Sequence, residues 1–70
     1  MDDQFWDMWA IRHARYAWSV HRGSTQPPPV KSVARNMEEA VFDVTFEGGE
    51  VFAVEVSGMG RVKLRPPVSA

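Results

Sequence analysis

The stretch that decides the fold is "VFDVTFEGGEVFAVEV", residues 41–56. Large apolar residues recur at every second position on both sides of a glycine pair, which is the period expected for half-buried β-strands. A two-residue turn at the glycines would mix apolar and acidic side chains on one face. A three-residue loop at 47–49 instead brings Val44 opposite Phe52, with Gly49 in the left-handed position of a bulge. The stretch therefore predicts a β-hairpin with one continuous apolar face.

A third strand is predicted after the hairpin, where basic and apolar side chains alternate in "RVKLR". A second three-residue loop, at 58–60, would pair Val56 with Val62 and place Glu55 beside Lys63 on the outer surface. The prolines that follow end the strand, because proline cannot donate to a ladder of hydrogen bonds. We therefore expect a meander of three antiparallel strands.

The N-terminal residues 3–22 have the pattern of an amphipathic helix. Acidic residues lie at its start and basic residues toward its end, which suits the helix dipole. Gly23 stands where a left-handed C-terminal cap belongs, and prolines follow soon after. At about 100° per residue the pattern gives one broad apolar face, which we expect to cover the strands, since a lone sheet needs a second layer. The residues expected on this buried face are Phe5, Trp6, Trp9, Ala10, His13, Tyr16, Ala17 and Val20.

The opposite face of this helix carries a second apolar strip beside arginines. Trp9 and Trp18 are nine residues apart in the sequence, which turns them about 180° from each other on a helix. We do not expect one sheet to bury both, so we assign Trp9 to the fold and Trp18 to a partner. Trp, Met and Arg are typical of interface centres. The candidate partner-binding residues are Met8, Ile11, Arg12, Arg15, Trp18 and Arg22.

A proline-rich connector, residues 23–39, lies between the helix and the hairpin. Its three consecutive prolines favour a stiff, extended spacer. The connector could also fold back and cover Trp18. Residues 30–39 allow two interpretations: an edge strand at 30–35 that ends in a turn at 36–39, or a single helical turn.

The predicted fold is α+β, with one N-terminal helix packed on a three-stranded antiparallel meander, or a four-stranded one if residues 30–35 join the sheet. A chain of 70 residues forms one domain at most. The predicted organisation is helix 3–22, connector 23–39, meander 40–65 and tail 66–70.

The composition excludes several classes of protein. The chain has no Cys, so disulfides, thiolate metal sites and cysteine catalysis are excluded. A net charge of −1, from 8 Lys+Arg and 9 Asp+Glu, argues against a general binder of polyanions. No apolar run approaches the roughly 20 residues that span a bilayer, and the acidic N-terminus is unlike a signal peptide. We expect a cytoplasmic protein that does not bind a membrane.

The sequence carries no pattern that is typical of an active site. No glycine-rich loop precedes a helix, and the serines have no evident His–Asp setting. His13 lies in the middle of the expected buried face, and His21 is too far along the helix to share a metal with it. We interpret His13 as a structural histidine that is hydrogen-bonded in the core. We expect no enzymatic activity, no cofactor and no metal.

These observations favour a non-catalytic protein-binding module. A short, Cys-free, single compact domain resembles the small phage-encoded inhibitor proteins of the anti-CRISPR type, although no motif accompanies the resemblance. The resemblance implies a bacterial protein complex as the partner, steric blocking as the mechanism, and the bacterial host cell as the location. Two other hypotheses stay open. One is a nucleic-acid-binding accessory protein that uses the basic side of the helix, and the other is a homodimer formed through the strip around Trp18.

Overall fold

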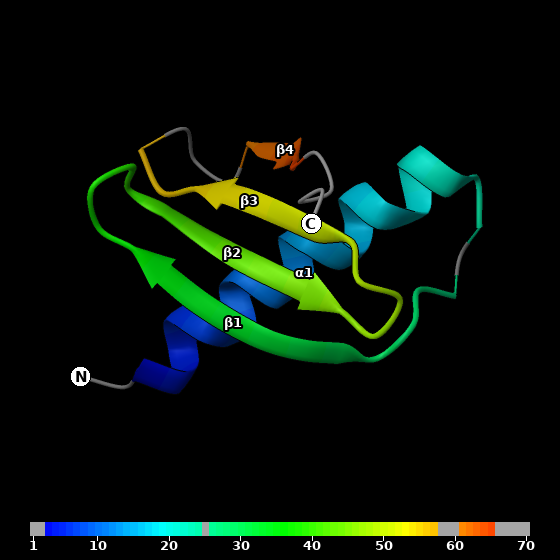
Figure 1. Cartoon of the computed structure of the whole chain (residues 1–70), viewed down its shortest axis with the longest axis horizontal. Helices are drawn as coiled ribbons and strands as arrows, with labels where there is room; N and C mark the ends of the chain where they lie inside the picture. Colours follow the sequence, from blue (N-terminus) through cyan, green and yellow to red (C-terminus); the bar gives the residue numbers. More distant parts are fainter. Residues whose placement is uncertain (1–2, 25, 58–60, 66–70) are drawn as a thin grey trace.

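The computed structural model describes residues 3–24, 26–57 and 61–65, which form one helix on one sheet. The four strands are antiparallel neighbours in the order β1-β2-β3-β4, and the helix α1 crosses one face of their sheet (Figure 1). The predicted α+β fold is confirmed, in its four-stranded form. The elements are α1 (Asp3–Arg22), β1 (Val30–Asn36), β2 (Val41–Phe46), β3 (Val51–Glu55) and β4 (Val62–Leu64).

The hairpin of β2 and β3 has the predicted register and the predicted three-residue loop. Val44 lies opposite Phe52. The N–H of Phe46 donates to the carbonyl of Glu50, and the N–H of Gly49 donates to the carbonyl of Phe46, both at 2.9 Å. Gly49 has a φ of 94°, a conformation that glycine adopts without the strain a Cβ would cause. The glycine pair therefore fixes which face of each strand is apolar.

The segment before the hairpin forms the edge strand β1, which confirms the first of the two interpretations of residues 30–39. β1 pairs with β2 so that Asn36 lies opposite Val41. The side-chain oxygen of Asn36 accepts the N–H of Glu39 at 3.1 Å and closes the turn. The proline-rich connector is therefore shorter than predicted and ends at Pro29.

The register of β4 differs from the prediction by two residues, because Val62 pairs with Val54 and not with Val56. This register is held by the hydrogen bond from the N–H of Glu55 to the carbonyl of Arg61, at 2.7 Å. The N–H of Val56 points to the other side and donates to the carbonyl of Ala40, at 3.0 Å. Val56 is 39% exposed. A shift of two residues keeps each side chain of β4 on its predicted face. The predicted loop at 58–60 and the tail at 66–70 lie outside the described residues.

The hydrophobic core lies between α1 and the inner face of the sheet. Ala10 and Ala14 are fully buried, and their small side chains let the helix approach the strands closely. Phe46 and Phe52 pack edge to face below them, with ring centroids 5.5 Å apart. The prediction that alternate residues of the β2–β3 hairpin point into the core is confirmed, since Phe42, Val44, Phe46, Phe52 and Val54 are buried. The buried core cluster consists of Ala10, Ala14, Phe42, Val44, Phe46, Phe52 and Val54.

The helix turns a different face to the sheet from the one its pattern predicts. Phe5, Trp6, Tyr16 and Val20 are expected in the core, but they are 60%, 36%, 74% and 67% exposed. The face toward the sheet is centred on Ala10 and Ala14. The physical reason is the space available in the core. The phenylalanine rings of the sheet already fill it, so the helix positions nearest the sheet have room only for the methyl group of an alanine. The assignment of the aromatic-rich face to the core is wrong at these four positions.

Trp9 and Trp18 both pack against the core. Trp9 meets Phe42 edge to face, with ring centroids 6.1 Å apart. Trp18 and Ile11 are partly buried against the same cluster, so the expectation that they lie on the exposed side of the helix is wrong. The small alanines explain this outcome. The sheet can approach the helix closely between the two indoles and receive one of them on each side.

We predict that Trp18→Ala lowers the free energy of unfolding by about 3 kcal/mol, at the lower end of the range for large core aromatics because Trp18 is only partly buried. The matched control Tyr16→Ala removes an exposed ring from the same helix and should change stability by about 0.5 kcal/mol or less. Urea unfolding of both variants measures the difference. Equal midpoints for the two variants would contradict this placement of the helix.

Candidate functional site

Glu50 joins the C-terminal end of α1 to the β2–β3 hairpin. The indole N–H of Trp18 donates to Glu50 Oε1 at 2.9 Å. Arg22 donates from Nε to Glu50 Oε2 at 3.1 Å and from Nη2 to the same oxygen. Two of the predicted partner-binding residues, Trp18 and Arg22, therefore contribute to the attachment of the helix to the sheet.

The environment of Glu50 changes its acidity. Partial removal of its carboxyl group from water raises the pKa, but the hydrogen bonds from Arg22 and Trp18 and the charge of Arg22 act in the opposite direction. Their combined effect is larger, so the pKa of Glu50 lies below its ordinary value of 4.5. The carboxylate stabilises the fold while it is ionised.

Four of the predicted partner-binding residues are exposed, namely Met8, Arg12, Arg15 and Arg22. Arg22 is already bonded to Glu50, which leaves Met8, Arg12 and Arg15. Met8 is 64% exposed. The helix wheel places these residues on the same side as the apolar residues that the core leaves out. We call this set the exposed stripe of α1, and it consists of Phe5, Met8, Arg12, Arg15, Tyr16 and Val20.

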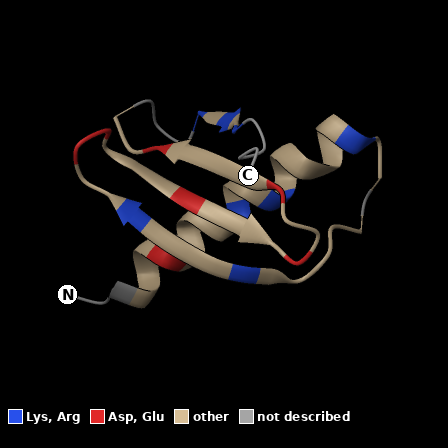
Figure 2. Cartoon of the chain, viewed as in Figure 1, with Lys and Arg blue, Asp and Glu red and all other residues tan. Residues whose placement is uncertain are grey.

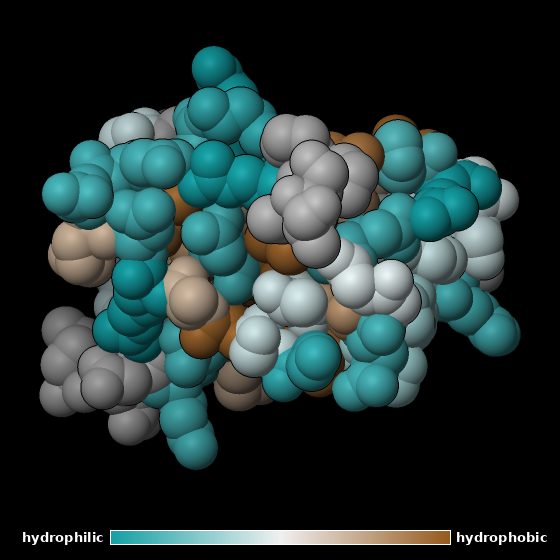
Figure 3. Space-filling view, in the orientation of Figure 1, coloured by the Kyte–Doolittle hydropathy of each residue, from teal (hydrophilic) through white to brown (hydrophobic). Residues whose placement is uncertain are grey.

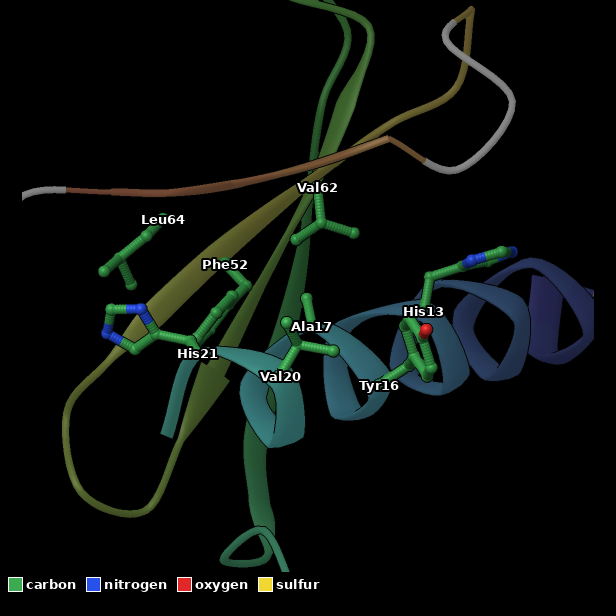
Figure 4. A pocket seen from close by; sticks show the side chains of 8 residues that line it. All are labelled: His13, Tyr16, Ala17, Val20, His21, Phe52, Val62 and Leu64. Carbon is green, nitrogen blue, oxygen red and sulfur yellow. The ribbon is translucent and has the colours of Figure 1, made fainter. Parts of the chain in front are cut away.

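A groove runs beside the exposed stripe, between α1 and the strands β3 and β4 (Figure 4). Its volume is about 470 Å³, within the range of ligand and peptide sites. Val62 and Leu64 point into it from β4, and Val20 points into it from the helix (Figure 4). Leu64 is 44% exposed although its pattern predicts burial. The residues that line the groove are His13, Tyr16, Ala17, Val20, His21, Phe52, Val62 and Leu64.

The groove is wide because the alanines set the contact between helix and sheet. The closest approach lies at Ala10 and Ala14, over the buried side chains of β2 and β3. β4 has only three residues and lies at the margin of the helix. The space between this strand and the helix is therefore left for other groups to fill. His13 lines the groove and is only partly buried, so its interpretation as a histidine in the middle of the core is wrong.

Basic residues are concentrated on β4 and on the part of α1 that follows its first turns (Figure 2). Residues 8–22 of the helix contain arginines and histidines but no Asp or Glu, and residues 61–65 contain arginines and a lysine but no Asp or Glu. Arg12, Arg15 and Arg61 are exposed. None of these three arginines lines the groove, but Arg61 directly precedes β4, whose apolar side chains do.

The outer face of the sheet has a different character, because its charges pair with one another. Arg65 donates to Asp43 at 3.1 Å and to Glu39 at 2.7 Å. The predicted pair of Glu55 and Lys63 is confirmed, with 3.1 Å between Lys63 Nζ and Glu55 Oε2. Exposed pairs of this kind contribute little stability. The face is largely hydrophilic (Figure 3), so the groove side is the better candidate for a binding surface.

No protein-family model, curated protein or solved structure matches the chain. The described residues hold no group of three or more His, Cys, Asp or Glu side chains that could bind a metal ion. Within the same part of the chain, no helix has the length and apolar character needed to cross a bilayer. The candidate site therefore has to be judged from its own geometry.

The sequence interpretation missed Tyr16, Val20 and Leu64 as surface residues because it assigned all three to the core. A signal was available in the alanines at 10, 14 and 17, which follow helical spacing. A row of small residues marks the line along which a helix approaches its neighbour most closely. Centring the helix wheel on this row would have placed Tyr16 and Val20 outside the core.

We predict that Glu50→Gln lowers stability near neutral pH and that the difference from the wild type disappears in acid. The pKa of Glu50 is lowered by folding, so its contribution is complete above the ordinary value of 4.5 and is lost as the pH falls through the lower folded value. Gln keeps an oxygen acceptor for Trp18. Urea unfolding of both proteins between pH 3 and pH 7 measures the difference. A constant difference over this range would rule out the ionised carboxylate as the cause.

Proposed function

We propose that the protein is a non-catalytic binding module for another protein, and that its contact surface is the exposed stripe of α1 together with the groove beside it. The observation that carries this proposal is the exposure of four large apolar side chains on one side of a single helix. Aromatic residues, Met and Arg are enriched at interface centres, and Met adapts its shape to a partner. The four side chains are Phe5, Met8, Tyr16 and Val20.

Exposed apolar groups of this number suggest a partner, because contiguous apolar patches on monomers are often functional. Arg12 and Arg15 lie within the stripe and supply cations next to the apolar side chains. Arginine beside an aromatic ring is a frequent hot-spot combination. We infer a protein partner whose contact region is apolar with acidic groups at its margin.

We further propose that binding itself is the activity, so that the module acts by occupying a surface of its partner. The short chain and its resemblance to small phage-encoded inhibitors of the anti-CRISPR type support this mode of action. A bacterial protein complex in the host cytoplasm is the corresponding partner. Steric blocking requires only a stable interface, which the stripe and the groove can supply.

One observation favours nucleic-acid binding as a second candidate. Tyr16 is the most exposed aromatic ring among those described, and Arg12 precedes it by one helical turn. An aromatic ring beside arginines can stack on a base while the arginines contact phosphates. Such binding falls steeply as salt concentration rises, whereas an apolar protein interface depends on salt only modestly. The salt dependence of binding therefore separates the two functions.

We predict that the double variant Tyr16→Ala/Val20→Ala weakens partner binding about 30-fold or more, as expected for a hot spot, and leaves the fold intact. The test is capture from a nuclease-treated bacterial lysate, followed by affinity measurement with the purified partner. Thr45→Ala, on the outer face of the sheet, is the matched control and should bind as the wild type does. Equal affinity of all three proteins, or capture that requires nucleic acid, would contradict the proposal.

A further inference from the structure

The strand β4 presents one free edge at the side of the groove. The sheet order places β4 at the end of the sheet, with β3 as its neighbour. The backbone of Arg61 accepts a hydrogen bond from β3 at 2.7 Å, and the N–H of Arg65 donates to β3 at 2.8 Å. Backbone groups of alternate residues point to opposite sides of an antiparallel strand. The N–H and C=O groups of Val62 and Leu64 therefore point away from β3, toward the open edge.

The side chains of the same two residues point into the groove. Val62 lies across from Ala17 and Val20 of the helix, and Leu64 lies near His21 (Figure 4). A peptide strand added beside β4 would thus form hydrogen bonds with the free backbone groups of Val62 and Leu64. Every second side chain of this peptide would lie over the groove. The edge and the groove together form a complete site for an extended peptide.

The charges around this site favour an acidic peptide. The side chains of Arg61, Lys63 and Arg65 alternate with those that enter the groove, so they would lie beside the outward side chains of an added strand. Arg65 is held by Asp43 and Glu39, and Lys63 pairs with Glu55 but keeps 63% of its side chain exposed. Arg61 is exposed. Oppositely charged cross-strand neighbours stabilise strand pairing.

The same charges disfavour a second copy of the chain as the occupant. An antiparallel pairing of two β4 strands centred on Lys63 would place this lysine opposite its own copy, and Arg61 opposite Arg65. Like charges directly opposite each other destabilise a strand pair. The edge is therefore better suited to a different chain than to a homodimer.

We propose that β4 binds an extended segment of a protein partner by strand addition, and that this segment alternates apolar residues, which fill the groove, with acidic residues, which face Arg61 and Lys63. The inference rests on the proposed function and specifies the chemistry of its partner. Main-chain hydrogen bonds to Val62 and Leu64 supply affinity, and the groove with its cationic margin supplies specificity.

The test is a selection from a displayed library of random peptides of about nine residues against the full chain. We expect the enriched peptides to alternate apolar and acidic residues. We also expect their binding to slow hydrogen exchange at the amides of Val62 and Leu64, which point to the free edge. The enriched peptide is then synthesised, and a matched peptide with Lys in place of each acidic residue serves as the charge control.

Two variants at one position separate strand addition from simple packing. Val62→Pro removes the free N–H and should weaken the enriched peptide about tenfold or more, while the β3–β4 ladder, which does not use this N–H, is kept. Val62→Ala keeps the N–H and should weaken binding of the enriched peptide much less. An amide NMR spectrum of each variant confirms that it is folded, and the exchange measurement on the wild type needs no variant.

The results also distinguish this inference from the proposed function. If the enriched peptides bind Val62→Pro and the wild type equally but lose binding to Tyr16→Ala/Val20→Ala, strand addition is wrong and the helix surface still binds. If no alternating acidic peptide is enriched, or if the lysine peptide binds equally well, the inference is overturned. If neither set of variants affects binding, both proposals fail.

Discussion

Two alanines of the helix, Ala10 and Ala14, pack against the phenylalanines of the sheet. This contact sets the arrangement of the other parts of the fold. Methyl groups at the closest approach bring the helix near to Phe46 and Phe52, with which Ala10 and Ala14 form one buried cluster. This contact determines which way the remaining side chains of α1 point. Trp9 and Trp18 flank the alanines and contact the core, while the residues between them on the far side remain in water. The same packing leaves space beside the short strand β4.

Much of the sheet could be predicted from the sequence because local rules determine it. The glycine pair permits one loop length that keeps Phe42, Val44 and Phe52 on one face, and the structure has that loop. The predicted register of β4 is two residues away from the observed one, which is held by the hydrogen bond from the N–H of Glu55 to the carbonyl of Arg61. The strand character of residues 30–36 also depends on pairing with β2. Both features depend on pairing with a neighbouring strand, and for residues 30–36 the local pattern allowed either a strand or a helical turn.

The rotation of the helix could not be obtained from hydrophobicity alone, because α1 has large apolar residues on nearly every side. Phe5, Tyr16 and Val20 look like core residues, but a small domain has no room for them beside the phenylalanines of the sheet. Trp18 shows the reverse case, since its indole N–H requires an acceptor and finds Glu50. Of the predicted partner-binding residues, the fold uses Ile11, Trp18 and Arg22. Met8, Arg12 and Arg15 remain available, next to a groove that only the tertiary structure creates.

Ala14 lies at the closest approach of helix and sheet, and replacing it with a larger residue is a direct test of this packing. Ala14→Leu inserts a large side chain at a fully buried position and should lower the free energy of unfolding by about 1–3 kcal/mol, the usual cost of overpacking a core. Arg15→Leu, one position further along on the exposed side, should change stability by about 0.5 kcal/mol or less. Urea unfolding of the two variants beside the wild type is the measurement. If Ala14→Leu is as stable as the wild type or more stable, the helix faces the sheet with its aromatic side, and this account is wrong.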